Sequence, residues 1–195
     1  MMQKTQDSRD ILFYCDMHGH SRAKNLFMYG CTNQKADRLK ERIFPLLFSK
    51  NSENFAFQNC NFVVQKAREA TARVVMWKEF NLINSFTLES TFCGPSDGRY
   101  QDCHFTIQIL KECGMLFCKT LIDYASNEPK VREVIRELET MFPSPKPEEA
   151  GGLSQHFNKN LDGDKDDNDK NGKKLDGNGK PIRKKKAAMN NGKND

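Results

Sequence analysis

The segment from Ile11 to Arg22 constrains this chain more than any other. It begins with five apolar residues, Ile11-Leu12-Phe13-Tyr14-Cys15, and such a run is typical of a strand covered on both faces. The run passes directly into Asp16-Met17-His18-Gly19-His20-Ser21-Arg22, so a carboxylate, two imidazoles, a hydroxyl and a guanidinium lie within seven residues. Because ligands in open α/β sheets bind where strands end, we expect a metal-binding or catalytic site after a strand at residues 11–17.

Three interpretations of the two histidines are open from the residues alone. In the first, His18 ligates a metal and Asp16 orients the imidazole. In the second, His18 and His20 both ligate, because alternate residues of a strand point to one face. In the third, both imidazoles are simply hydrogen-bonded near the surface. The apolar strand before them and the Ser-Arg pair after them favour the first two.

Two blocks of the sequence resemble a known family. Residues 15–22, followed by Asn25-Leu26-Phe27-Met28-Tyr29-Gly30-Cys31, are similar to the Asp-x-His-Gly-His-Ser-Arg segment of the cytosolic carboxypeptidases. Residues 65–77 and 84–94 resemble the family's stretch that ends in Ser-Tyr-Thr-x-Glu-Ser-Thr-Phe-x-Gly. The resemblance covers roughly residues 10–142. It implies a zinc metallocarboxypeptidase that removes glutamates from tubulin and other proteins.

The resemblance also implies roles for particular residues. His18 would be the third zinc ligand of a His-x-x-Glu plus His site, and His20 would not be a ligand. Glu89 would be the general base, which takes a proton from zinc-bound water and passes it to the leaving amine. Only 17 residues precede His18, and no His-x-x-Glu occurs anywhere in the chain. The resemblance is therefore to the C-terminal half of the catalytic domain, with one of three zinc ligands present.

The same resemblance suggests acidic protein tails, such as that of tubulin, as partners. Arg22 and Arg73 are candidates for binding them, because a guanidinium can clamp a carboxylate with two hydrogen bonds. The alternative function is a catalytically inactive module that binds acidic tails. A deacylase of the aspartoacylase type is disfavoured by the Arg-Val-Val-Met-Trp and Ser-Thr-Phe-Cys-Gly blocks.

Composition separates the chain into two parts at about residue 143. Residues 1–143 carry the resemblance, whereas residues 144–195 are rich in Lys, Asp, Asn and Gly and predict a disordered tail. From Gly151 onward, eleven Lys and Arg face seven Asp, so most of the net charge of +5 belongs to the tail. Specific nucleic-acid binding is therefore not expected. We interpret an EF-hand-like stretch at residues 167–178 and a basic run at 180–186 as solvated segments.

Cysteine usage and the absence of long apolar runs predict a cytoplasmic protein, and the family resemblance implies association with the cytoskeleton through tubulin. The seven cysteines are scattered and form no Cys-x-x-Cys, which is typical of a reducing compartment. The N-terminal residues have no apolar core of signal-peptide length, and no run suits a bilayer.

The predicted fold class is α/β: the C-terminal half of a mixed, twisted sheet flanked by helices. Strands are expected at residues 11–17, 26–29, 55–62, 73–80 and 83–88, the last placing Glu89 at its C-terminal end. Helices are expected at 34–49 with a kink or division at Pro45, at 102–112 and 115–125 divided near Gly114, and from Pro129 onward. Half a sheet leaves an unpaired edge and uncovered apolar surface. We therefore expect the isolated chain to be unstable or to associate, unless a partner or an upstream polypeptide completes the sheet.

Overall fold

The computed structural model describes residues 2–33 and 38–144. The predicted tail lies outside the described residues except for Ser144, and so do its EF-hand-like and basic segments. Among the described residues, no helix is long and apolar enough to cross a bilayer.

The centre of the fold is a mixed sheet of three strands, β1 (Tyr14–His20), β2 (Leu26–Tyr29) and β3 (Ser85–Thr91), in the order β1-β3-β2. The pair β1/β3 is parallel and β2/β3 is antiparallel. β3 is buried along nearly its whole length, whereas β1 is exposed from Asp16 to Gly19. This difference follows from the strand order, because among residues 2–33 and 38–144 β3 has a neighbour on both sides and β1 has one only.

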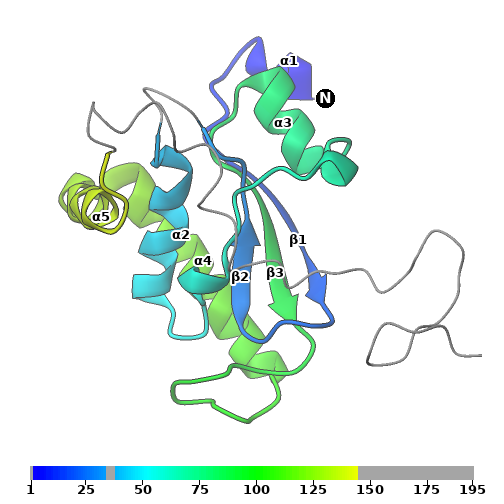
Figure 1. Ribbon diagram of the computed structural model, residues 1–195, viewed down its shortest axis with the longest axis vertical. Helices are drawn as coiled ribbons and strands as arrows, with labels where there is room; N and C mark the ends of the chain where they lie inside the picture. Colours follow the sequence, from blue (N-terminus) through cyan, green and yellow to red (C-terminus); the bar gives the residue numbers. More distant parts are fainter. Residues whose placement is uncertain (1, 34–37, 145–195) are drawn as a thin grey trace, which may run out of the picture. The chain divides into compact units, whose positions relative to one another are not determined.

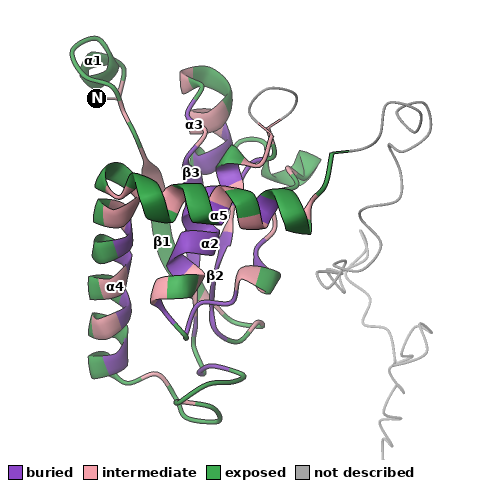
Figure 2. Cartoon of the chain, turned by 90° about the vertical axis from the view of Figure 1, so that its left-hand side faces the viewer, coloured by how far each residue is buried: buried purple, intermediate pink, exposed green. Residues whose placement is uncertain are grey.

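Helices α2 (Lys40–Asn51), α4 (Ile107–Ser126) and α5 (Glu128–Met141) contact one another and lie on one side of the sheet (Figures 1 and 2). α3 (Ala72–Phe80) contacts β1 and β3, and the short α1 (Met2–Gln6) precedes them in the chain. The mixed sheet flanked by helices confirms the predicted fold class.

Aromatic rings from the sheet and the helices form the main core. Phe44 of α2 is fully buried, and its ring lies 6.1 Å from Phe86 of β3 and 5.5 Å from Phe117 of α4, centroid to centroid. A second cluster joins α5 to α2 through Val134 and Leu138. Burying these apolar side chains is the main force that holds α2, α4 and α5 on the sheet.

Side-chain caps mark the starts of the two C-terminal helices. The Thr106 hydroxyl accepts from the amide of Ile109 at the start of α4, and the Asn127 side chain accepts from Lys130 at the start of α5. Pro129 lies in the first turn of α5, as predicted, where a missing N–H costs no helical hydrogen bond.

Two predictions about helices and strands in the middle of the chain are wrong. Residues 73–80 form the helix α3 and not a strand, although Val74-Val75 favours a strand locally. The reason is tertiary packing, because α3 contacts β1 and β3 and its Val74 is fully buried. Residues 107–126 form one helix rather than two, because Gly114 costs only about 1 kcal/mol relative to Ala while the helix packs on the core.

Three further predictions need smaller corrections. Residues 55–62 run beside β2 and bridge it at Phe55 and Asn61, but a 3₁₀ turn at Phe57–Asn59 interrupts them, so they are not a strand. β1 begins at Tyr14 and continues through Gly19, which does not end the strand. α2 begins at Lys40 and continues past Pro45 without division, while residues 34–37 of its predicted span lie outside the described residues.

Candidate active site

The centre of the candidate site is the pair formed by His18 and Glu89. The two residues are in register across the parallel strands β1 and β3, each at the fifth position of its strand. His18 Nδ1 lies 3.1 Å from Glu89 Oε2. Glu89 therefore lies within β3 and not at its C-terminal end, contrary to prediction. In-register pairing places the two side chains on one face of the sheet.

Glu89 lies in an environment that disfavours its charge. The residue is 4% exposed, and Oε2 receives no hydrogen bond of good geometry even though His18 is close. Burial raises the pKa of Glu89, and the imidazoles of His18 and His20 oppose that shift. A buried carboxyl group with a raised pKa is suited to exchanging protons near neutral pH.

His20 lies on the same face of β1 as His18, and its side chain extends toward β2. Its Nδ1 accepts hydrogen bonds from the backbone amides of Arg22 and Ala23, at 3.2 and 3.0 Å. Its ring lies 5.1 Å from the ring of Phe27 on β2, centroid to centroid. Because β3 runs between β1 and β2, and Phe27 pairs in register with Glu89, the His20 ring covers the part of β3 that carries Glu89. Backbone bonds to Nδ1 leave only Nε2 of His20 to face other groups.

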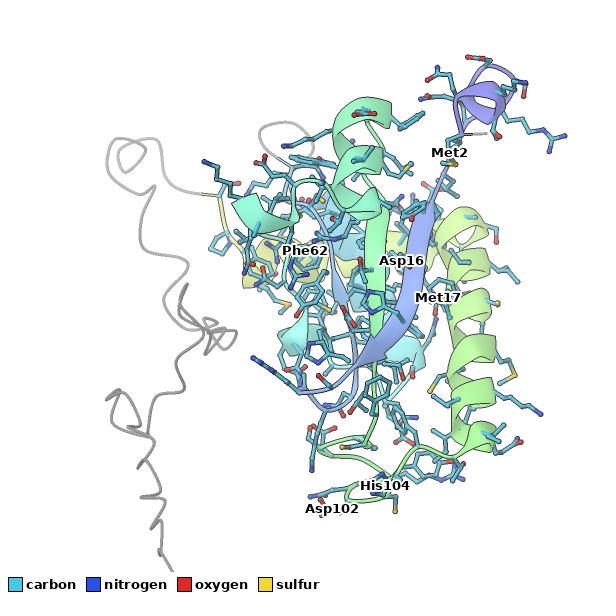
Figure 3. All side chains as sticks on the ribbon, turned by 90° about the vertical axis from the view of Figure 1, so that its right-hand side faces the viewer. Met2, Asp16, Met17, Phe62, Asp102 and His104 are labelled. Atoms are coloured by element: carbon cyan, nitrogen blue, oxygen red, sulfur yellow. The ribbon has the colours of Figure 1, made fainter. Side chains whose placement is uncertain are left out.

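Two more charges act on Glu89. Asp16, exposed on β1 in Figure 3, raises the pKa of Glu89 further, and the guanidinium of Arg68 lowers it. Arg68 lies in the 3₁₀ turn Lys66–Arg68 and is exposed. Arg68 lies in the second resembling block, but its role could not be predicted from the sequence, because nothing local distinguishes it from an ordinary surface cation.

The structure places the two predicted substrate-binding arginines differently. Arg22 is exposed in the loop after β1, and its backbone amide donates one of the two hydrogen bonds to His20 Nδ1. Arg73 is buried on α3, and its guanidinium donates a hydrogen bond to the carbonyl of Gly30 and lies 3.5 Å from Cys31 Sγ. These contacts give Arg73 a structural function, which is to tie α3 to the residues that follow β2.

The described residues do not by themselves fit a catalytic metal. No group of three or more His, Cys, Asp or Glu side chains in the described part of the chain is arranged to hold a metal ion. Catalytic zinc sites use three protein ligands and keep one open position. His18, whose side chain is half exposed, is a single candidate ligand beside the carboxylate of Glu89.

Comparison with solved structures identifies the class of fold. The chain resembles the crystal structure of a metallo-carboxypeptidase from Burkholderia cenocepacia, with a TM-score of 0.52 and 15% sequence identity. The likeness covers 65% of this chain and 34% of that one. The described residues therefore have part of a metallo-carboxypeptidase fold.

Comparison of sequences is more specific. No protein-family model matches the chain. It is 43% identical over 164 residues to cytosolic carboxypeptidase 2 of Mus musculus and 45% identical over 148 residues to cytosolic carboxypeptidase 3 of the same species. These matches cover 83% and 72% of this chain, so over most of its length it belongs with the cytosolic carboxypeptidases. The chain spans only 18% and 15% of the length of these two relatives.

Proposed function

We propose that this chain is part of a zinc-dependent carboxypeptidase that removes glutamates from acidic protein tails, such as that of tubulin, in the cytoplasm. The observation that carries the proposal is the in-register pair of His18 and Glu89, with a buried Glu89 Oε2 that has no hydrogen-bond donor. That pair stands at the positions to which the cytosolic carboxypeptidase resemblance assigns a metal ligand and a general base.

In this proposal Glu89 moves the proton. Its raised pKa lets the carboxylate accept a proton from water at the scissile bond and return it to the leaving amine. His18 contributes one imidazole nitrogen toward a metal, and the remaining ligands come from outside the described residues. Zinc, when bound, would supply a Lewis acid for the scissile carbonyl.

Exposed cations favour an acidic substrate. Arg22, Lys66 and Arg68 are all exposed, and the charge of Arg68 acts directly on Glu89. Arginine recognises carboxylates through two parallel hydrogen bonds, so a glutamate-rich tail suits this set of cations. The same cations support the second candidate function, a module that binds acidic tails without cleaving them. The single metal ligand favours this second candidate.

The test is zinc content and glutamate release with the full 195-residue chain. Elemental analysis measures zinc, and release is measured on a polyglutamylated peptide, with the chain alone and together with the upstream part of the mouse relative's catalytic domain. We expect Glu89→Gln to abolish release, whereas Glu79→Gln, which changes an exposed glutamate on α3, should preserve it. If both preparations bind the peptide but neither releases glutamate, the chain is the binding module instead.

A further inference from the structure

Two arginines connect the C-terminal end of α5 to the start of α2. Arg38, just before α2, donates hydrogen bonds to the backbone carbonyls of Phe142 and Pro143, the second at 3.1 Å. Its Nη1 also donates to the hydroxyl oxygen of Ser144, at a long distance of 3.4 Å. The guanidinium of Arg42 on α2 lies 4.8 Å from the centre of the Phe142 ring. The residues that follow α5 therefore lie against cationic side chains.

A groove opens beside Ser144, between the start of α2 and the second half of α5. Its volume is about 580 Å³, so it has room for a group larger than the serine hydroxyl. The charged residues that line it together with Ser144 are Arg38, Lys40 and Glu139. Two cations against one carboxylate make this groove more favourable for an anion than for a cation.

The start of α2 adds to this preference. The first amides of a helix have no carbonyl partner within the helix, and the helix dipole places partial positive charge there. Leu39, the N-cap residue of α2, makes no side-chain hydrogen bond to these amides, and it lines the same groove. The negative end of the α5 dipole opposes an anion on Ser144. Arg38 offsets that effect, because it already binds the carbonyl of Phe142, the C-cap residue of α5.

The sequence around Ser144 has the pattern that proline-directed protein kinases recognise. Ser144 is followed by Pro145, and no other Ser or Thr of the 195 residues precedes a proline. Ser144 is exposed and lies outside α5, and a following proline disfavours helical backbone at the residue before it. The hydroxyl is therefore accessible on a non-helical segment, as a kinase substrate requires.

We propose that Ser144 is a phosphorylation site for a proline-directed Ser/Thr kinase, and that the phosphate binds Arg38 and fastens α5 to α2. ATP is the phosphoryl donor. The bond from Ser144 Oγ to the γ-phosphorus forms, the bond from that phosphorus to ADP breaks, and the hydroxyl proton passes to the catalytic base of the kinase. Phosphoserine brings a charge of about −1.5 to −2 and three strong acceptor oxygens. A guanidinium can bind two of these oxygens at once, which replaces one long contact to a hydroxyl.

The phosphate would act on the packing of α5 against α2. These two helices contact each other (Figure 2), and Val134 and Leu138 of α5 share a buried cluster with Ile43 and Leu47 of α2. A stronger attachment at the end of α5 should reduce local opening of its last turn. The proposal does not rest on the proposed carboxypeptidase function, because none of these residues belongs to the candidate active site.

The first test is phosphoryl transfer to the full 195-residue chain. The chain is incubated with ATP and either a mitogen-activated or a cyclin-dependent protein kinase, and the product is mapped by fragmentation mass spectrometry. We expect a phosphoryl group on Ser144 in the wild-type chain and loss of that transfer in Pro145→Ala. The proposal is overturned if neither kinase modifies Ser144, or if Pro145→Ala is modified at Ser144 as fast as wild type.

The second test measures whether Arg38 binds the phosphate. Phosphoserine is incorporated genetically at position 144, and phosphorus NMR follows its second ionisation, whose ordinary pKa is about 6. A neighbouring guanidinium favours the dianion, so this pKa should be at least about 0.5 lower in the folded chain than in the same chain unfolded in urea. Arg38→Gln should remove most of the difference. Arg132→Gln is the matched control, because Arg132 pairs with Glu128 at the other end of α5, and it should preserve the difference.

The urea-unfolded chain is a reference that remains valid if Arg38→Gln does not fold. Equal phosphate pKa values in the folded and unfolded wild-type chain would overturn the proposal, and so would an equal effect of Arg132→Gln and Arg38→Gln. Hydrogen exchange gives an independent readout. We expect slower exchange at residues 138–142 in the phosphorylated chain than in the unmodified one, and unchanged exchange there would mean that the phosphate does not fasten α5.

Discussion

Replacing Glu89 with glutamine should stabilise the folded chain while removing the group proposed to move the proton. Glu89 is 4% exposed, its Oε2 has no hydrogen-bond donor, and the side chain of its neighbour His18 is half exposed. A buried group left unsatisfied costs about 1–3 kcal/mol, and more when it is charged. Because the side chain of His18 is half exposed, solvent screens its attraction for Glu89, which returns at most about 1 kcal/mol. We therefore expect Glu89→Gln to raise the free energy of unfolding by about 1 kcal/mol at neutral pH.

The pH dependence of this effect follows from the direction of the pKa shift. Burial raises the pKa of Glu89 above the ordinary glutamate value of about 4.3, so the folded chain holds this proton more tightly than the unfolded chain does. The stabilisation by that proton is complete below the ordinary pKa and is lost as the pH rises through the raised one. The gain from Glu89→Gln should accordingly be small in acid and grow toward neutral pH.

Urea unfolding followed by the fluorescence of Trp77, the single tryptophan, measures both effects. For a domain of this size, about 1 kcal/mol corresponds to roughly 3 °C in the thermal midpoint, which gives an independent check. Glu79→Gln controls for the loss of one exposed carboxylate. A Glu89→Gln chain that is no more stable than wild type at neutral pH would refute the reasoning, as would a gain that increases toward acid.

Two other substitutions test the core and the buried arginine. Phe44 is fully buried and its ring contacts five other aromatic rings, so Phe44→Ala should lower the free energy of unfolding by about 3–5 kcal/mol in the same urea assay. A loss below about 1 kcal/mol would mean that these rings are not packed as described. Arg73→Met should cost about 1.5–3 kcal/mol through its bond to the Gly30 carbonyl, whereas Arg22→Met should stay within about 0.5 kcal/mol of wild type. Equal stability of the two arginine variants would count against the structural function of Arg73.

Part of the candidate site was predictable because its residues carry strong local patterns. His18 follows an apolar run, and Glu89 lies in a run of strand-forming residues, so both strands could be predicted, and the family resemblance assigned the two side chains to one site. Arg68 could not be found this way, because its effect on Glu89 depends on how the turn Lys66–Arg68 folds back. The burial of Arg73 was equally hidden, since it follows from residues 73–80 being a helix and not a strand.

By itself, the sequence determined the fold class, the three strands of the sheet, the start of α5 and the two residues at the centre of the candidate site. These features rest on periodicity, on proline and on motifs, all of which act over a few neighbouring residues. Only the tertiary structure decided that α3 is a helix and that α4 continues through Gly114. Each of these depends on which distant surface a segment packs against, and the free energy of that packing exceeds the local preferences of about 1 kcal/mol that favoured the other outcome.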